Sequence, residues 1–400
     1  MSEVVTAQQY FANKKRIQII AQTTIACNLR CKHCYEADCD YHHGIMTDEV
    51  LERIIKLSLE SYDEVSFLWF GGEPLMAGLT FFEKVVRFQS AYKKENQKIE
   101  NSVQTNAILI DQAYIDFFVK NDFHISISLD AQYNDCLRTN TDETIRGALL
   151  CEKAGLHLGF LSVIHSNNYE HMYEMYTYFK EKNWKAKFNR IYGEGAAKQN
   201  FDFLIPCEKY NDAYINFFEK WLYDSAAEKF SSFEIVLSSL YRTGNRECVF
   251  SGCLFSWLSF TPTGEAYNCP RFMGSKYSFG NIMEANTIND LFYSPMYGKL
   301  AKKAIERRNK CRSECKLFSF CQGGCNAQCF NSHGLEEPSS DLCLFAKTIF
   351  PYVSKRLFEL SKSNDISSLN QYMQQYISSN KERIENVYNF IFSEPAKMKN

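Results

Sequence analysis

Three cysteines stand close together near the N-terminus, in the run Cys27-Asn-Leu-Arg-Cys31-Lys-His-Cys34. They share one short loop, so they cannot all pair with one another as disulfides. Three thiolates on a tight loop suit three corners of an iron–sulfur cubane and leave the fourth iron open to another ligand. A closed zinc site is the alternative, because zinc also binds neighbouring cysteines but takes four protein ligands. The nearest candidates for a fourth zinc ligand are Cys39, His42 and His43.

The composition limits the kinds of partner that the chain can have. The formal net charge is −2 at pH 7, so no basic excess is present for phosphate contacts and we expect no nucleic-acid partner. No apolar run approaches the roughly 20 residues that span a bilayer, so we expect no membrane association. Residues 1–11 lack the pattern of a signal peptide, which predicts a cytoplasmic location. In a reducing cytoplasm, the 16 cysteines indicate metal binding or catalysis rather than disulfides.

Strand-like and helix-like segments alternate from residue 16 to residue 191. Short β-branched runs predict strands at 16–24, 65–70, 99–105, 125–129, 158–164 and 187–191. Amphipathic runs predict helices at 47–61, 79–94, 111–120, 141–155 and 169–183. This alternation is typical of parallel β/α units, either in a doubly wound sheet or in a partial barrel. Periodicity alone does not choose between these two α/β folds.

The pattern changes beyond residue 205. An aromatic-rich helix is predicted at 206–229, and after Arg242 the chain is rich in short turns, glycines and cysteines. Beyond Cys343 the apolar spacing is again helical, and a polar tail follows at 395–400. We therefore expect a second, cysteine-rich region after the β/α repeats.

The run Gly71-Gly72-Glu73-Pro74 follows the second predicted strand directly. Two glycines let a backbone approach a ligand without a side-chain clash, and the carboxylate of Glu73 suits a cationic group. The cysteine run also follows a predicted strand. Parallel β/α folds place their chemistry at these carboxyl ends of the strands, so we expect both motifs at one end of the fold.

Together, the C-x3-C-x2-C run and the GGEP turn resemble those of the radical S-adenosylmethionine (SAM) enzymes. The resemblance implies a partial (β/α)6 TIM-like barrel over residues 12–235. It also implies a 4Fe–4S cluster on Cys27, Cys31 and Cys34, whose open iron binds SAM while Glu73 faces the SAM amino group. The residues that it places against SAM are His33, Gly71, Gly72, Glu73, Gln104, Ser128, Arg138 and Gly193.

Two of these assignments rest on short motifs further along the chain. Ser128 falls in the segment Ser126-Ile-Ser128-Leu-Asp130, which resembles the S-x-D segment of the family. Arg138 ends Asp135-Cys-Leu-Arg138, which resembles the D-x-x-R that follows it. The family commonly has Gly-Pro after the aspartate, where this chain has Ala131-Gln132.

The later cysteines resemble a SPASM domain, which we place at residues 236–345, before a C-terminal helical segment and tail at 346–400. The resemblance implies two auxiliary 4Fe–4S clusters, although this chain has Cys311-x3-Cys315 where the family usually has C-x2-C. By order along the chain, the first cluster takes Cys248, Cys253, Cys269 and Cys325. The second takes Cys311, Cys315, Cys321 and Cys343. Two zinc sites are the alternative. Cys329 continues the x3 spacing and could replace a neighbour as ligand.

The resemblance also implies the reaction. A reduced cluster cleaves SAM, and the resulting 5′-deoxyadenosyl radical removes hydrogen from an unactivated carbon of a peptide or protein. Auxiliary clusters suit a net oxidation, and we expect a flavodoxin- or ferredoxin-type electron donor. No further catalytic residue is assigned. The remaining cysteines, which we expect to be unreactive, are Cys39, Cys136, Cys151, Cys207 and, unless it replaces a neighbouring ligand, Cys329.

Over nearly its whole length, the chain resembles the anaerobic sulfatase-maturing group, for example in Cys321-x-Gly323-Gly324-Cys325. That group carries an aspartate directly after the cysteine of its GX4C motif and a glutamine before GGEP. Here Pro270 and Phe70 hold these positions, and proline cannot accept a proton.

We therefore predict oxidative modification or crosslinking of a ribosomally synthesised peptide. The alternatives are sulfatase maturation, which forms formylglycine, and a non-enzymatic iron–sulfur redox protein. Only 26 residues precede Cys27, so we expect no fused leader-binding domain. Either a separate leader-binding protein assists, or the precursor peptide binds directly.

Overall fold

A computed structural model describes residues 15–37, 44–242, 248–251 and 253–393. Within these residues the strands form an eight-stranded sheet in the order β6-β5-β4-β3-β2-β1-β7-β8. Strands β1 to β5 pair in parallel with their sequence neighbours. The predicted strands are present as β1 (Arg16–Gln22), β2 (Glu64–Phe70), β3 (Lys98–Thr105), β4 (Phe123–Ser128), β5 (Leu158–Ile164) and β6 (Ala186–Arg190). The structure thus confirms the α/β class with the parallel strands of a partial TIM barrel.

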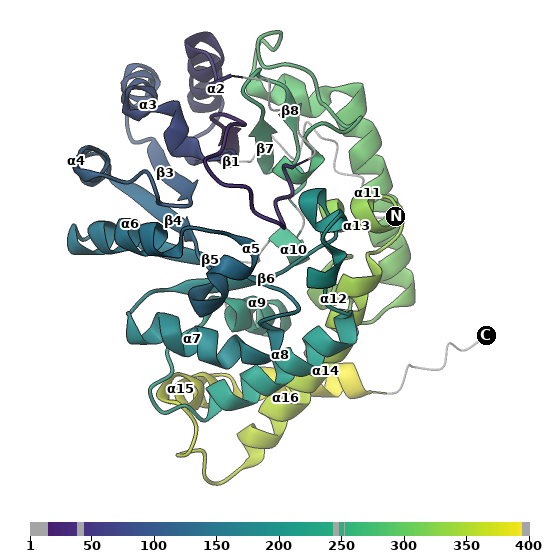
Figure 1. Cartoon of the computed structure of the whole chain (residues 1–400). Helices are drawn as coiled ribbons and strands as arrows, with labels where there is room; N and C mark the ends of the chain where they lie inside the picture. The colour runs from purple at the N-terminus through teal and green to yellow at the C-terminus, as the bar shows by residue number, and fades with distance from the viewer. Residues whose placement is uncertain (1–14, 38–43, 243–247, 252, 394–400) are drawn as a thin grey trace. The chain divides into compact units, whose positions relative to one another are not determined.

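Helices connect these parallel strands, as predicted. They are α2 (Asp48–Ser61), α3 (Leu79–Tyr92), α4 (Gln112–Lys120), the short α5 (Asn134–Leu137), α6 (Thr141–Lys153) and α7 (Met172–Glu181). Figure 1 shows α2, α3, α4 and α6 along the outer side of the strands. Local sequence sets where they begin: the Thr47 hydroxyl accepts a hydrogen bond from Val50 N, and the Asp111 carboxylate accepts one from Tyr114 N. These are side-chain N-caps, which satisfy backbone donors at a helix start.

Aromatic side chains fill the space between the strands and their outer helices. Phe82 of α3, Phe118 of α4 and Phe123 of β4 are fully buried, and their rings meet at centroid distances of 5.3–6.2 Å. Trp69 of β2 is also fully buried and contacts Phe81 edge to face. This packing fixes the helices on the strands and leaves the carboxyl ends of the strands to carry the loops.

The region after β6 differs from the prediction at two helices. The predicted helix 206–229 ends earlier, as α8 (Cys207–Leu222), and a separate helix α9 (Ser231–Tyr241) follows. Asp224 causes the break, because its carboxylate accepts a hydrogen bond from Ala226 N and its carbonyl accepts one from Ala227 N. Such local bonds from aspartate compete with the helix and favour a turn.

The cysteine-rich region contains strands and a long helix that the sequence did not reveal. Strand β7 (Trp257–Phe260) pairs in parallel with β1, and β8 (Ala266–Tyr267) pairs antiparallel with β7. Both strands are too short for alternating hydrophobicity to identify them. The long helix is α11 (Pro295–Glu314). The remaining helices are α10 (Cys248–Ser251), α12 (Phe318–Cys321), α13 (Asn326–Ser332), α14 (Ser340–Lys362), α15 (Gln371–Ser379) and α16 (Lys381–Phe392).

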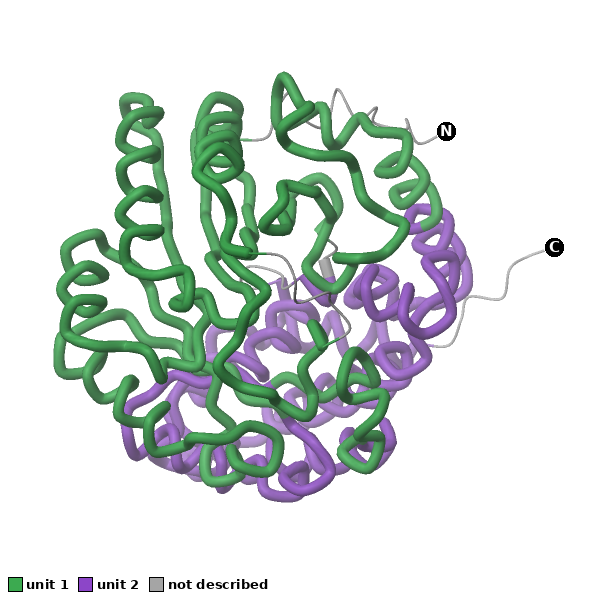
Figure 2. Tube along the Cα trace, turned by 45° about the horizontal axis from the view of Figure 1, so that its top comes forward, with its two compact units in different colours: residues 1–163, 189–204, 253–303 green, residues 164–188, 205–252, 304–400 purple. Residues whose placement is uncertain are grey.

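The chain divides into two compact units, coloured separately in Figure 2. Unit 1 comprises Met1–Val163, Asn189–Leu204 and Cys253–Lys303, and unit 2 comprises Ile164–Phe188, Ile205–Gly252 and Ala304–Asn400. The predicted domain boundaries after residues 235 and 345 fall inside α9 and α14. They therefore mark a change of sequence motif rather than a linker, and the three-domain division stays a prediction. Among the described helices, none is both long and apolar enough to cross a membrane.

Candidate active site

The cysteine loop and the GGEP turn pack against each other at the carboxyl ends of β1 and β2, in unit 1. Gly72 N donates a hydrogen bond to Thr24 O at 3.0 Å, and Glu73 N donates one to Ala26 O at 2.8 Å. A β-carbon on Gly72 would stand 2.3 Å from the carbonyl oxygen of Ile25, which is far inside van der Waals contact. From the sequence, this glycine is expected to allow the approach of a ligand. The structure gives it a second reason, because the turn lies directly on the backbone of the cysteine loop.

The three thiols of the loop lie close enough to act on one another electrostatically. Burial raises the pKa of Cys27 to about 11 and that of Cys34 to about 12, and the neighbouring thiols add to both shifts. Burial also raises the pKa of Cys31. Thiols bind iron as thiolates, so loading a cluster here must release these protons.

This donor set fits a cluster in its chemistry, because it offers three thiols on one loop. In the part of the chain that the structure describes, no three His, Cys, Asp or Glu side chains already stand in metal-holding positions. The role of the three loop thiols as cluster ligands stays a prediction. Cys39, His42 and His43, the candidates for a fourth zinc ligand, lie outside the described residues.

Glu73 is buried, at 1% exposure, and accepts hydrogen bonds from three groups of the chain. The donors are Thr105 Oγ1 at 2.6 Å, Asn106 N at 2.8 Å and Leu75 N at 3.1 Å. Burial outweighs these bonds and raises the pKa of Glu73 to about 7. Among the described residues, no basic side chain forms an ion pair with it. A cation bound beside Glu73 would therefore be favoured, since it would offset a desolvated negative charge.

Arg138 joins the cysteine loop to the end of β4. Its Nε lies 3.0 Å from Asp130 Oδ2, in a largely buried ion pair, and its positive charge also acts on the thiol of Cys31. Asp130 accepts a further hydrogen bond from Val163 N at 2.7 Å. The sequence analysis assigned Arg138 to SAM, and that contact stays a prediction. The structural role of its partner Asp130 was not predicted.

The other predicted SAM residues lie on three different segments. Gln104 Nε2 donates to Ser128 Oγ at 2.9 Å, so the ends of β3 and β4 bring these two half-buried side chains together. His33 is half-buried on the cysteine loop. At Gly193, an added β-carbon would meet only Leu204, at an ordinary 3.5 Å. The fold therefore does not require glycine there, and the approach of Gly193 to SAM stays a prediction.

A second ion pair, between Arg271 and Glu194, lies in unit 1. Arg271 Nε donates to Glu194 Oε2 at 2.7 Å, and a second guanidinium nitrogen bonds the other carboxylate oxygen. The guanidinium carbon also lies 5.0 Å from the ring centre of Tyr192. Sequence reasoning missed this pair because 77 residues separate its members, and neither belongs to a local motif.

This ion pair is close to the cysteine loop. Ala196 N, two residues beyond Glu194, donates to Cys34 O at 2.9 Å. The charges of Cys269 and Arg271 both act on the phenol of Tyr35, the residue after Cys34. Cys269, which the SPASM resemblance assigns to an auxiliary cluster, is thus near the cysteine loop within unit 1.

Unit 2 brings together the four cysteines predicted to bind the second auxiliary cluster. Cys311 lies near the end of α11 and Cys315 just beyond it, Cys321 ends α12, and Cys343 lies in the first turn of α14. Burial raises the pKa of Cys321 to about 11, and the charges of Cys315, Cys311 and Cys343 raise it further. Residues 311–321 and the start of α14 therefore converge here, although cluster ligation stays a prediction.

The cysteines predicted to bind the first auxiliary cluster belong to both units. Cys253 and Cys269 are in unit 1, whereas Cys248 and Cys325 are in unit 2. Their shared role stays a prediction. Cys329 is fully buried on α13, where its N–H donates to Cys325 O, and the charges of Cys325 and Cys311 act on its thiol.

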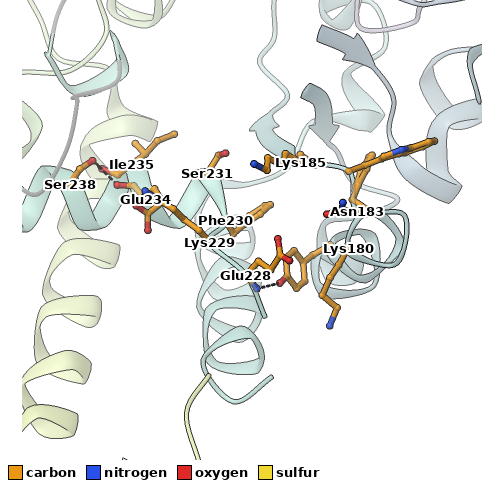
Figure 3. Close-up of a pocket in the computed structure, with 14 residues that line it drawn as sticks. Lys180, Asn183, Lys185, Glu228, Lys229, Phe230, Ser231, Glu234, Ile235 and Ser238 are labelled. Carbon is orange, nitrogen blue, oxygen red and sulfur yellow. Dashed lines mark hydrogen bonds and ion pairs between the residues drawn. The ribbon is translucent and has the colours of Figure 1, made fainter. Parts of the chain in front are cut away.

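Unit 2 also contains a cavity of about 390 Å³, lined by α7, the segment that leads into β6, and the start of α9 (Figure 3). None of the predicted site residues lines it. Two of its lysines are already paired with acids, Lys180 with Asp224 at 2.6 Å and Lys229 with Glu234 at 3.1 Å. The cavity therefore presents mixed charge and no single ligand chemistry.

Comparison with known proteins agrees with this geometry. Residues 22–179 match the Radical SAM superfamily. The chain is 29% identical over 377 residues to the cysteine-type anaerobic sulfatase-maturating enzyme of Clostridium perfringens, covering 86% of this chain and 98% of that protein. The structure of native anSMEcpe with bound AdoMet and Kp18Cys peptide is 28% identical, with a TM-score of 0.76, and the match covers 86% of this chain and 98% of that one.

A further structural match concerns the fold alone. Streptococcus suis SuiB bound to its precursor peptide SuiA has a TM-score of 0.53 and 18% identity, over 82% of this chain and 76% of that one. The family assignment rests on the superfamily match, the relative from Clostridium perfringens and the anSMEcpe structure. The two motifs at the strand ends agree with it. Together, these observations identify the chain as a radical SAM enzyme similar to the anaerobic sulfatase-maturating enzymes.

Proposed function

We propose that this enzyme is a maturase of a ribosomally synthesised peptide, which it oxidises or crosslinks at an unactivated carbon. SAM and a reduced cluster supply the hydrogen abstraction when bound. The cluster would be held by Cys27, Cys31 and Cys34. Two auxiliary clusters, with the cysteine sets given above, would accept the second electron of a net oxidation.

The residues around the cysteine loop would bind and orient SAM. Glu73 is buried and has three neutral donors but no cationic partner among the described residues, so it suits the SAM amino group. Gln104 and Ser128 already hydrogen-bond each other, so together they offer a preformed polar edge. Arg138 would act mainly by favouring the thiolate of Cys31, because Asp130 holds its guanidinium in place and its positive charge acts on that thiol.

The choice of peptide maturation rests on the residues that follow Cys269. Pro270 offers no proton acceptor there, and Arg271 is committed to an ion pair with Glu194. A mechanism that needs a carboxylate directly after this cysteine therefore has none at that position. That carboxylate and the glutamine before GGEP belong to the sulfatase-maturing pattern, so their replacement by Pro270 and Phe70 favours a different reaction on a peptide.

Sulfatase maturation is the second candidate, and the comparisons favour it. The relative from Clostridium perfringens, whose name gives this activity, shares 29% identity over 377 residues, which is 86% of this chain. The related anSMEcpe structure contains a peptide. The two candidates share a peptide substrate and differ in the group that accepts the proton and in the product.

One experiment separates the candidates. The purified protein is reconstituted without oxygen and incubated with SAM and dithionite, with either a short cysteine-rich precursor peptide encoded nearby or a sulfatase peptide containing Cys-x-Pro-x-Arg. Tandem mass spectrometry then locates any modification. We expect loss of two hydrogens and a crosslink in the precursor, and no formylglycine in the sulfatase peptide. Formylglycine formed by the wild-type protein would reverse the ranking.

A matched variant tests why the sulfatase peptide should not be converted to formylglycine. Pro270→Asp restores a carboxylate directly after Cys269. If the absence of this carboxylate is what blocks formylglycine formation, the variant should gain some of that activity.

The same assays test two proposed partners. Turnover with and without an added flavodoxin or ferredoxin tests the electron donor. Turnover of a precursor whose leader has been removed tests the need for a separate leader-binding protein.

A further inference from the structure

Arg307 is fully buried in unit 2, on the helix that carries Cys311. The two residues are four apart, so they lie on the same face of α11. The guanidinium donates three hydrogen bonds: Nε to Gly323 O at 3.1 Å, and its two terminal nitrogens to Leu335 O at 2.6 Å and Asn326 Oδ1 at 2.7 Å. All three acceptors are neutral.

The charge of this arginine is not balanced by an acid. Within the described residues, Arg307 forms no ion pair with a carboxylate. A guanidinium remains protonated in proteins, and burying a charge without a partner of opposite sign is costly. A buried cation whose acceptors are all neutral therefore indicates that an anionic group belongs beside it.

The surroundings of Arg307 point to cysteine sulfur as that group. Gly323, whose carbonyl it binds, lies between Cys321 and Cys325 in the sequence. Burial raises the pKa of Cys311 and of Cys329, and the positive charge of Arg307 opposes both shifts. A 4Fe–4S cluster with four thiolate ligands carries a net negative charge, and its potential responds to nearby charges and to hydrogen bonds to sulfur.

Asn326 supplies a second, independent observation. It is buried, at 2% exposure, and its Oδ1 accepts from Arg307, which fixes the amide so that Nδ2 must be the donor. Nδ2 is itself buried and has no hydrogen-bond partner among the described residues. Buried donors are rarely left unsatisfied in folded proteins, so an acceptor belongs beside this one. Sulfur of an adjacent cluster would provide it.

We propose that Arg307 is the counter-charge of the iron–sulfur cluster held by Cys311, Cys315, Cys321 and Cys343, and that Asn326 donates a hydrogen bond to a sulfur of that cluster. The inference rests on the proposed auxiliary cluster. Both groups are positioning residues rather than catalytic ones. Both stabilise the reduced, more negative cluster more than the oxidised one, so they raise its reduction potential.

The test is a redox titration followed by electron paramagnetic resonance. The full chain carries Cys27, Cys31 and Cys34 all changed to Ala, so that only auxiliary clusters contribute to the signal. In this background, Arg307→Gln should lower the midpoint potential of one cluster at unchanged iron content, and Arg307→Lys should shift it less. Lys299→Gln, which removes an exposed lysine from the same helix, is the matched control and should shift nothing.

A second variant covers the case in which Arg307→Gln does not fold. Asn326→Asp keeps the shape of the side chain but gives Arg307 a carboxylate partner and removes the amide donor, so it should lower the same potential. Unchanged potentials in a folded Arg307→Gln or Asn326→Asp protein would overturn the inference. Failure of the underlying assignment is distinguishable, because Cys315→Ala would then bind as much iron as the parent protein. That result would overturn both proposals together.

Discussion

The cysteine loop of unit 1 and the four-cysteine group of unit 2 each have an arginine nearby, but the two arginines differ in their partners. Arg138 pairs with Asp130 at 3.0 Å, so its charge is balanced within the fold. Among the residues that the structure describes, Arg307 binds only the neutral oxygens of Gly323, Leu335 and Asn326. This difference in charge balance is what we expect if the two predicted clusters differ in their fourth ligand.

Charge explains why the two sites would be built differently. In the proposed site, a cluster with three thiolates would leave one iron to SAM, a ligand that carries a positive sulfonium and whose amino group would lie beside Glu73. In the proposed auxiliary cluster, a fourth thiolate would add negative charge, and no SAM would bind there to offset it. A fixed, unpaired cation in the protein can do so. The four predictions below test this contrast, beginning with the largest expected effect.

The first prediction separates the roles of the two cysteine groups. Cys31→Ala should lower 5′-deoxyadenosine formation by roughly two orders of magnitude or more, because the cofactor carries the chemistry. Cys315→Ala should still cleave SAM but should give little modified peptide. Chromatography of 5′-deoxyadenosine and mass spectrometry of the peptide measure both. Equal loss of SAM cleavage in the two variants would remove the distinction between the sites.

The second prediction concerns the balanced pair of unit 1. Arg138→Met leaves Asp130 buried without its cation and should lower the free energy of unfolding by about 3–5 kcal/mol. Adding Asp130→Asn removes the unpaired charge and should recover part of the loss. Urea unfolding of the metal-free proteins measures the difference. A single variant as stable as the wild type would show that Asp130 does not depend on Arg138.

The third prediction uses the pKa of Glu73, which burial raises to about 7. The unfolded state ionises this carboxyl at lower pH than the folded state does. Its contribution to stability is therefore fully present below about pH 4.5 and is lost as the pH rises through 7. The loss amounts to up to about 3 kcal/mol.

The measurement compares the metal-free wild type with Glu73→Gln at pH 5 and pH 8. A neutral amide does not titrate, so the wild type should lose more stability between the two pH values than the variant does. Any constant offset from a lost hydrogen bond cancels in this comparison. Equal pH dependence of the two proteins would contradict a raised pKa.

The fourth and smallest effect is expected at Gly193. Its added β-carbon would meet only Leu204, at 3.5 Å, so Gly193→Ala should change the free energy of unfolding by no more than about 0.5 kcal/mol. Gly72→Ala is the contrasting variant, since its β-carbon would collide with the backbone of the cysteine loop. If Gly193 approaches SAM, Gly193→Ala should weaken SAM binding without changing stability. Unaltered binding, measured by calorimetry, would remove Gly193 from the site.

Much of the barrel and the central motifs could be predicted because local sequence governs them. β-branched runs alternate with amphipathic helices, and Thr47 and Asp111 cap helices at the predicted starts. The cysteine spacing and the GGEP turn follow strands β1 and β2 directly. In a parallel sheet this places both at the same edge.

Contacts between distant residues depended on the tertiary structure. Strand β7 has only four residues, and it pairs with residues of β1 that lie more than 200 positions earlier in the chain. The ion pair of Arg271 with Glu194 and the neutral acceptors of Arg307 leave no local pattern. By itself, the sequence identified the residues that are predicted to bind iron and SAM. Only packing decided which buried charges are balanced, because a charge is balanced by its neighbours in space and not by its neighbours along the chain.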